Sequence, residues 1–192
     1  KRKCNVILIT SDKSYKNLEL DRGYNEMDIL GGKDPYSGSK AAAEMIIHSY
    51  LSSYFDLKNN KVKICVARAG NVIGGGDWSN DRLIPDCMKK WKNSKTVIVR
   101  SPESTRPWQH VLEAVSGYML LSLELNKNSK MHKQIFNFGP SIKNNFTVKE
   151  LILETSKYWK KAKWKFSSSD KKFFESKLLK LNSQKAKKML GW

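Results

Sequence analysis

Short, continuous apolar runs alternate along this chain with longer stretches of helical pattern. The runs are typical of buried parallel strands, because they lack the apolar–polar alternation of half-exposed strands. They lie at residues 4–10, 62–67, 96–99 and 134–138. The stretches predicted to be helical cover residues 35–55, 83–91, 111–125 and 147–159, with a last short helix beginning after Asn182 or Ser183. Strands that alternate with helices predict an α/β fold built on a parallel sheet.

Three of these helices carry recognisable capping residues. Asp34 and Pro35 stand where an N-cap aspartate and a first-turn proline begin a helix. Thr147 and Glu150 have the spacing of a capping box. Gly191 is placed to end the last helix, since glycine readily adopts the left-handed conformation of that position. The caps therefore support the helix boundaries that the apolar pattern suggests.

Composition fits one ordinary globular domain, or most of one. Of the 192 residues, 40% are hydrophobic and 28% are charged, and the mean hydropathy is −0.57. Unbroken apolar runs such as residues 6–9 are too short to span a bilayer, and no signal segment opens the chain. We therefore expect a cytoplasmic protein with no membrane partner.

The net charge of +18 raises the question of a nucleic-acid partner. Only six of the 36 basic residues are arginine, and the lysines are spread out except between Lys157 and Lys188. The interleaved arginine and aromatic residues that base-reading surfaces favour are missing. A lysine-rich solvated surface is therefore the preferred interpretation, and nucleic acid is not the expected partner.

Cysteine and histidine placement argues against a disulfide framework and a metal site. Cys4, Cys65 and Cys87 are odd in number, far apart and set in apolar surroundings, as expected of reduced, buried thiols. The histidines show no metal-ligand spacing, so we expect no metal; they are His48, His110 and His132.

A polar segment, Thr10-Ser11-Asp12-Lys13, stands at the carboxyl end of the first predicted strand. Ligands of open α/β sheets bind at that edge, so Ser11, Asp12 and Lys13 could face a substrate. An ordinary exit from a strand into a loop would look the same, and this segment alone leaves both interpretations open.

Tyr36 and Lys40 stand four residues apart and therefore share one face of the predicted helix. The lysine ammonium favours the phenolate form of the tyrosine electrostatically. A tyrosine tuned in this way can take a proton from a sugar or alcohol hydroxyl. The small residues between the two leave room for a ligand.

A glycine-rich run, Gly74-Gly75-Gly76, follows the second predicted strand and suggests a loop that cradles phosphate. It is neither a dinucleotide fingerprint nor a P-loop. Asn71, Arg82 and the loop amides could contact a diphosphate, and Arg106 is a second candidate because guanidinium pairs with phosphate bidentately. Surface ion pairs are the alternative for both arginines. His110 is expected to pack at a helix start.

Together these motifs resemble the extended short-chain dehydrogenase/reductase family, most of all its CDP-glucose 4,6-dehydratases. The Tyr-x-x-x-Lys pair marks only the superfamily. The runs Asn-Val-Ile-Gly-Gly-Gly-Asp-Trp and Arg-Pro-Trp-Gln-His-Val are typical of a much smaller group of proteins within it. The segments that carry the resemblance are residues 10–15, 34–40, 67–78, 81–86, 106–111 and 181–192.

The resemblance implies conversion of CDP-glucose to CDP-4-dehydro-6-deoxy-glucose and water, with NAD as cofactor. Tyr36 would deprotonate the sugar 4-hydroxyl, and Lys40 would support it and bind the nicotinamide ribose. Ser11 would lie near the 4-hydroxyl and Asp12 would protonate the 6-hydroxyl. Lys13 stands where related dehydratases carry a glutamate base, and burial would be needed for it to act as one. The implied diphosphate ligands are Asn71, Arg82 and Arg106.

The resemblance also implies an organisation. Residues 1–75 would be the C-terminal part of a doubly wound, Rossmann-type domain. Residues 76–192 would be a smaller α/β region that binds the nucleotide sugar, with residues 108–140 returning to the first domain. The family's N-terminal glycine-rich turn, which seats the NAD pyrophosphate, is absent from the sequence. We therefore expect a fragment, inactive alone, of a protein that is a homodimer at full length.

Two other functions stay open. A different nucleotide-sugar dehydratase or an epimerase on the same scaffold would share most of these motifs, although an epimerase has no elimination step that needs Asp12 and Lys13. The alternative of another class is a non-catalytic basic fragment that binds nucleic acid or a protein. Salt-dependent retention on DNA without nucleotide-sugar binding would favour that fragment.

Overall fold

Three parallel strands form the main sheet of the protein. The computed structural model describes residues 3–55, 61–167 and 177–192. The strands lie in the order β1-β2-β7, and Thr10 pairs with Arg68, which pairs in turn with Asn137. The prediction of an α/β fold with a parallel sheet is confirmed. The bounds are β1 (Cys4–Ser11), β2 (Val62–Ala69) and β7 (Ile135–Phe138).

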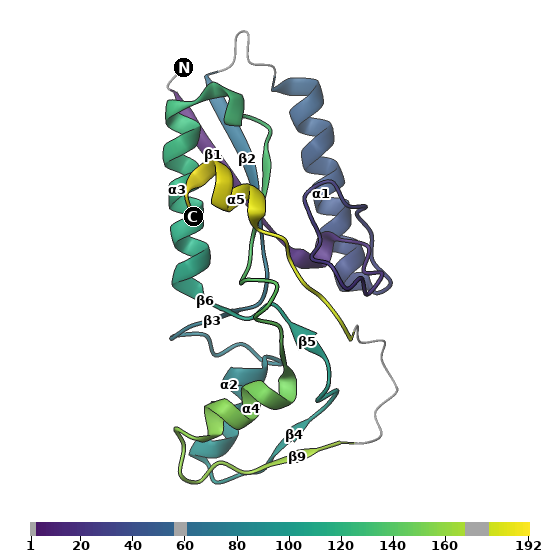
Figure 1. The fold of residues 1–192 in the computed structure, drawn as a ribbon, viewed down its shortest axis with the longest axis vertical. Helices are drawn as coiled ribbons and strands as arrows, with labels where there is room; N and C mark the ends of the chain where they lie inside the picture. The colour runs from purple at the N-terminus through teal and green to yellow at the C-terminus, as the bar shows by residue number, and fades with distance from the viewer. Residues whose placement is uncertain (1–2, 56–60, 168–176) are drawn as a thin grey trace.

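Helices cover both faces of this sheet, as Figure 1 shows. They are α1 (Pro35–Tyr54) on one face and α3 (Val111–Lys127) and α5 (Gln184–Leu190) on the other. Successive side chains of a strand point to opposite faces. Ile64 and Val66 therefore pack with Leu51 of α1, whereas Cys65 and Ala67 pack with the buried residues of α3 and α5.

A second cluster of elements lies below the sheet in Figure 1, around its own apolar core. Trp91 is buried at its centre, and its indole nitrogen donates to the carbonyl of Lys163 at 2.9 Å. The sequence pattern predicted α2 and β4 there but not β9. The elements are α2 (Leu83–Lys92), β4 (Val97–Val99), α4 (Val148–Ser156) and β9 (Trp164–Phe166), with β4 and β9 parallel.

Short two-stranded ladders connect the two parts of the molecule. The parallel pair joins residue 72 to 109 and residue 73 to 110, directly after the main-sheet strand β2 and directly before α3. An antiparallel pair joins Thr105 to Thr147 at the start of α4. The strands are β3 (Val72–Ile73), β6 (Gln109–His110), β5 (Thr105–Arg106) and β8 (Phe146–Thr147), and a 3-10 turn η2 (Ser129–Met131) follows α3.

The polar stretch after β1 contains a small core of its own. It begins with the 3-10 turn η1 (Asp12–Ser14) and continues as a loop beside α1 (Figure 1). Tyr15 and Tyr24 stack with ring centroids 5.2 Å apart and pack on Leu179 and Leu181. Residues almost the whole chain apart thus hold this loop in place.

The predicted helix caps are present. Asp34 accepts from the backbone N–H groups of Tyr36 and Ser37 at 3.0 Å each. The Thr147–Glu150 capping box is complete, although α4 ends at Ser156, earlier than predicted. Gly191 ends α5 in the left-handed conformation, with φ of +67°.

One of the three predicted buried thiols is exposed. Cys65 and Cys87 are fully buried, as expected, but Cys4 is exposed at the start of β1. The apolar run behind Cys4 suggested burial, but the first residue of the strand lies at its exposed end. Burial raises the pKa of Cys65 to about 12, and it does the same to Cys87.

We expect one thiol of three to react with Ellman's reagent in the native protein at mildly alkaline pH. Cys4 is accessible, whereas Cys65 and Cys87 are shielded and have almost no thiolate there. The measurement compares thiol release before and after addition of guanidinium chloride. Cys4→Ser should abolish the native reaction, and fast release of more than one equivalent would contradict the structure.

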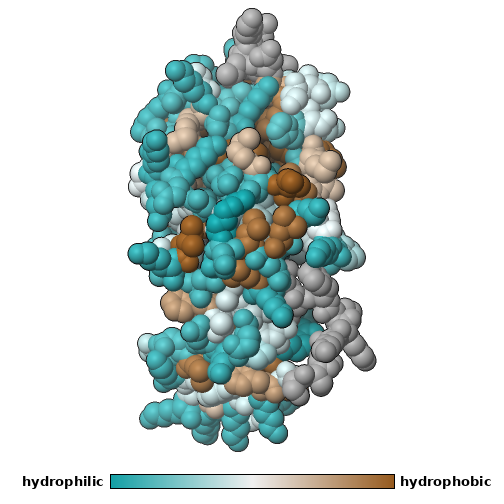
Figure 2. Space-filling view, turned by 45° about the vertical axis from the view of Figure 1, so that its right-hand side comes forward, coloured by the Kyte–Doolittle hydropathy of each residue, from teal (hydrophilic) through white to brown (hydrophobic). Residues whose placement is uncertain are grey.

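The surface in Figure 2 is mostly hydrophilic, with apolar side chains in separate groups. Within the part of the chain that the structure describes, no helix has the length and apolarity to cross a membrane. The same residues contain no group of three or more His, Cys, Asp and Glu side chains that could hold a metal ion. Part of the lysine-rich stretch, residues 168–176, lies outside the described residues.

Candidate functional site

The carboxyl end of β1 delivers three polar residues to the edge of the sheet. Ser11 ends the strand, and its hydroxyl lies 3.0 Å from Asp12 Oδ1. Lys13 Nζ lies 3.3 Å from Asp12 Oδ2, and the Lys13 backbone N–H donates to the Ser11 hydroxyl. The Asp12 side chain is only 3% exposed. A buried carboxyl group is therefore held between a hydroxyl and an ammonium.

Lys13 is partly buried beside Asp12. Its side chain is 28% exposed, and its ammonium is paired with Asp12. This contact places a positive charge next to the Asp12 carboxyl group.

The first turn of α1 presents Tyr36 and Lys40 on one face. The Asp34 cap fixes the start of this turn, and hydrogen bonding from the Ser37 hydroxyl keeps the Asp34 pKa below its ordinary value. Tyr36 is 57% exposed, and Lys40 Nζ lies 5.4 Å from the centroid of its ring. The two side chains therefore lie next to each other on one side of the helix, with the ammonium near the tyrosine ring.

A cavity of about 760 Å³ brings together five of the predicted site residues. Its size lies within the range of small-molecule sites. The glycine-rich loop at residues 74–76 and the start of α2 form much of its wall. The five predicted residues that line it are Lys13, Tyr36, Asn71, Arg82 and Arg106.

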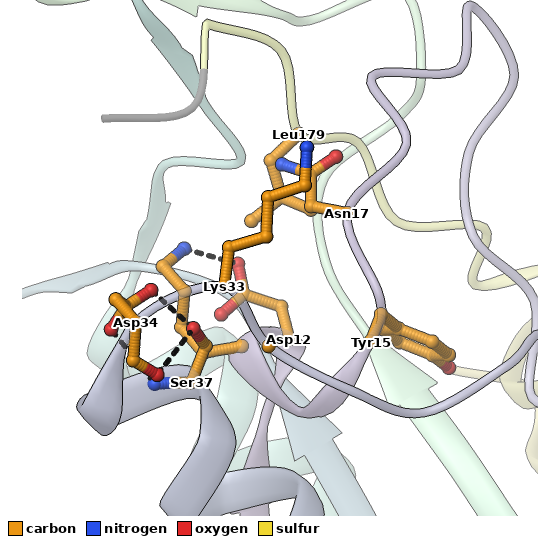
Figure 3. A pocket seen from close by; sticks show the side chains of 9 residues that line it. Asp12, Tyr15, Asn17, Lys33, Asp34, Ser37 and Leu179 are labelled. Atoms are coloured by element: carbon orange, nitrogen blue, oxygen red, sulfur yellow. Dashed lines mark hydrogen bonds and ion pairs between the residues drawn. The ribbon is translucent and has the colours of Figure 1, made fainter. Parts of the chain in front are cut away.

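A second, smaller cavity of about 40 Å³ lies beside η1 and the start of α1. Figure 3 shows Asp12 in its centre, between the Asp34–Ser37 pair and Tyr15. Lys13 lines both cavities and so joins them. Of the other predicted residues, Ser11 and Lys40 line neither cavity. Ser11 contacts Asp12, which lines the small cavity, and Lys40 lies beside Tyr36, which lines the large one.

Charges around the large cavity are mostly positive. Arg82 Nε lies 3.5 Å from Asp77 Oδ2, and both side chains are at least one-third exposed. Hydrogen bonds from Ser79 keep the Asp77 pKa below its ordinary value. Arg106 donates to the carbonyl of Thr105 at 2.7 Å. The exposed Arg82–Asp77 ion pair is of a weak kind and can be exchanged for an anionic ligand.

His110 caps α3 and is exposed, so the prediction that it packs at the helix start is only half right. Its Nδ1 accepts from the backbone N–H of Leu112 at 3.2 Å. The imidazole therefore satisfies a helix N-terminus and does not line the large cavity.

A buried ion pair links β2 to α1 beside the site, and no sequence motif assigned it a role. Arg68 on β2 donates to both carboxylate oxygens of Glu44 on α1, at 2.8 and 3.0 Å, and also to the Tyr15 hydroxyl at 2.9 Å. Glu44 lies one turn beyond Lys40. A charged residue inside an otherwise apolar strand was the available signal, since a buried charge needs a partner.

Comparison with known proteins shows the family to which the chain belongs. Residues 1–192 match the GDP-mannose 4,6 dehydratase family. CDP-glucose 4,6-dehydratase of Salmonella typhimurium is 41% identical over an alignment of 191 residues, which covers 97% of this chain and 53% of that protein. The chain spans about half the length of the curated relatives it matches.

Solved structures share the fold. UDP-glucuronic acid 4-epimerase from Bacillus cereus, in complex with UDP-glucuronic acid and NAD, superposes with a TM-score of 0.80 at 18% identity, covering 98% of this chain and 55% of that one. dTDP-glucose 4,6-dehydratase from Bacillus anthracis, in complex with NAD, gives 0.73 at 22% identity, covering 97% and 55%. These structures show the fold, and the sequence match shows the family. The chain belongs to the GDP-mannose 4,6 dehydratase family, within the extended short-chain dehydrogenases/reductases that its motifs indicated.

Proposed function

We propose that this chain provides the catalytic and sugar-nucleotide-binding groups of a nucleotide-sugar 4,6-dehydratase acting on CDP-glucose. The observation that carries the proposal is the large cavity, which Tyr36 and Lys13 line together with Asn71, Arg82 and Arg106. A relative that is 41% identical and named CDP-glucose 4,6-dehydratase supports the choice of nucleotide.

The residues at the start of α1 fit the ribose and nicotinamide end of NAD. Tyr36 opens onto the cavity, and Lys40 stands one turn away, so that a hydroxyl and an ammonium could donate to a ribose. NAD, when bound, supplies the group that accepts a hydride from the sugar C4 and returns it at C6. The sequence lacks a Gly-x-Gly-x-x-Gly run, so we assign none of its residues to the NAD pyrophosphate.

Each catalytic side chain has a defined proton to move. Tyr36 acts in its phenolate form, which the Lys40 ammonium favours, and becomes a neutral phenol when it takes the proton of the sugar 4-hydroxyl as C4 becomes a ketone. The ketone makes the C5 proton acidic, so that a base removes it while Asp12 protonates the 6-hydroxyl, which leaves as water. Ser11 and Lys13 then stabilise the Asp12 carboxylate through the contacts seen beside it. A hydride returned to C6 and a proton returned to C5 complete the product, so the oxidation at C4 and the reduction at C6 cancel.

The remaining predicted residues would hold the substrate. Arg82 and Arg106 approach the large cavity from the start of α2 and from β5, and guanidinium groups pair well with a diphosphate. We also propose that the chain has the two regions that the family resemblance implies. Residues 1–75 belong to a Rossmann-type domain, and residues 76–192 form the region that binds the sugar nucleotide. The return of α3 and β7 to the main sheet supports the placement of residues 108–140.

The test is an assay of the full-length protein with CDP-glucose and NAD in D₂O. We expect the 4-dehydro-6-deoxy sugar nucleotide to form, with one deuterium at C5, as measured by NMR and mass spectrometry. UDP-, GDP- and dTDP-glucose serve as competing substrates. Conversion of one C4 epimer into the other without loss of water would identify an epimerase instead.

A further inference from the structure

Two neighbouring segments at the large cavity contain buried polar atoms without partners. Four shielded side-chain atoms lack a hydrogen bond within the described ranges, and three of them belong to Asn71, Trp108 and Gln109. Asn71 and Trp108 both line the large cavity. The unpartnered atoms of these two are the Asn71 amide oxygen, which accepts, and the Trp108 indole nitrogen, which donates.

The fold holds these two residues side by side. The Gln109 backbone N–H donates to the carbonyl of Asn71 at 3.0 Å, and β3 and β6 begin their pairing at the next position. Gly70 lies directly against Pro107, because a Cβ at Gly70 would stand 2.6 Å from Pro107 Cγ. Backbone pairing and a close glycine–proline contact thus fix the spacing of Asn71 and Trp108.

An unpartnered buried polar atom is costly, and native proteins leave few of them. The Trp108 N–H needs an acceptor, and the Asn71 oxygen needs a donor. A diphosphate offers only acceptors at neutral pH, so it can satisfy Trp108 but not the Asn71 oxygen. A sugar nucleotide offers both, since its phosphate oxygens accept and its hydroxyl groups donate.

We propose that Trp108 and Asn71 form a donor–acceptor pair that binds the sugar nucleotide. The indole N–H donates to an oxygen of the ligand, and the Asn71 amide oxygen accepts from a ligand hydroxyl. This inference rests on the proposed function for the class of ligand. It gives Trp108 a binding role and turns the amide oxygen of Asn71 toward a hydroxyl group, whereas the sequence assigned Asn71 to the diphosphate alone.

The experiment follows the indole N–H signals of the ¹⁵N-labelled full-length protein by NMR while CDP-glucose is added. The Trp108 signal, identified by its loss in Trp108→Phe, should shift downfield as the ligand saturates. Calorimetry should show Kd for CDP-glucose about tenfold higher in Trp108→Phe, as expected for the loss of one hydrogen bond. Asn71→Leu should raise Kd by a similar factor.

Trp192→Phe is the matched control, because the Trp192 indole donates to the Glu113 carbonyl at 3.0 Å and does not line the cavity. Its Kd should equal that of the wild type. A Trp108 signal that does not move at saturation, or a Trp108→Phe variant that binds like Trp192→Phe, would overturn the pair. If Trp108→Phe does not fold, replacing each other tryptophan of the protein one at a time identifies its signal, and the signal that remains belongs to Trp108 and decides by its shift.

The outcomes also separate this inference from the proposed function. If the protein binds UDP-, GDP- or dTDP-glucose and not CDP-glucose, the CDP-glucose assignment fails, and the pair is judged with the sugar nucleotide that binds. If none of the four binds, both the proposed function and the pair are wrong.

Discussion

Replacing Arg68 by methionine is expected to lower the free energy of unfolding by about 3–5 kcal/mol, the cost of leaving a buried charge without its partner. The side chains of Arg68 and Glu44 are each only 2% exposed. Methionine fills much of the same volume but provides no donors. Among the residues that the structure describes, Thr10 alone would still donate a hydrogen bond to the Glu44 carboxylate.

The effect should spread beyond the ion pair, because Arg68 joins strand β2 to two other parts of the site. It contacts α1 through Glu44 and the loop after β1 through the hydroxyl of Tyr15. Burial raises the pKa of Tyr15 to about 12, so this hydroxyl keeps its proton and donates to Asn137 on β7 at 2.8 Å. Removing the guanidinium should therefore weaken the packing of α1 on the sheet. It should also weaken the attachment of the turn that contains Asp12.

Urea unfolding followed by circular dichroism measures the change. Arg22→Met is the matched control, since Arg22 also pairs bidentately, with Asp28, but its side chain is 53% exposed. Exposed pairs contribute little, so this control should unfold close to the wild type.

A second substitution separates the lost charge pair from lost packing. Adding Glu44→Gln to Arg68→Met removes the unpaired carboxylate and should restore part of the stability. Equal unfolding of Arg68→Met and Arg22→Met would contradict the role assigned to the buried pair. A double variant no more stable than Arg68→Met would show that packing dominates.

Local signals allowed most of the main sheet and its helices to be predicted. The capping atoms of Asp34 and Thr147 make the hydrogen bonds that their spacing indicated. The runs that became β1, β2 and β7 are apolar because helices cover both faces of the sheet. Such features depend on neighbours a few residues away, and the sequence displays them directly.

Elements that depend on distant partners could not be predicted. Strand β9 has three residues, two of them exposed, and exists because Val97 and Val99 offer it a parallel edge. The core formed by Tyr15 and Tyr24 needs Leu181, far along the chain. Nothing near any of these residues in the sequence specifies the partner.

The candidate site shows the same division. Tyr36 and Lys40 share a helix face, as their four-residue spacing indicated, because a helix fixes that relation. The unpartnered indole of Trp108 became evident only when β3 and β6 placed it beside Asn71. The motifs therefore indicated the chemistry of the site. The tertiary contacts show which polar groups have partners within the protein and which do not.

Tyr36→Phe is expected to lower kcat of the full-length protein by about 10²–10⁴-fold, the usual contribution of a positioned acid–base group. The substitution removes only the hydroxyl that the proposal assigns to the sugar 4-hydroxyl. Tyr36 is 57% exposed, so its loss should not disturb folding. Because Arg82 and Arg106 remain to hold the diphosphate, Kd for CDP-glucose should change little.

Tyr50→Phe provides the control, since Tyr50 lies on the same helix, is also 57% exposed and does not line either described cavity. Steady-state kinetics and calorimetry on both variants separate catalysis from binding. A Tyr36→Phe enzyme within a few-fold of Tyr50→Phe would show that another group takes the proton. A large loss confined to Tyr36→Phe would tie the chemistry to the phenol beside Lys40. The two variants lose the same atom from the same helix at the same exposure, whereas Tyr36 lines the large cavity and Tyr50 does not.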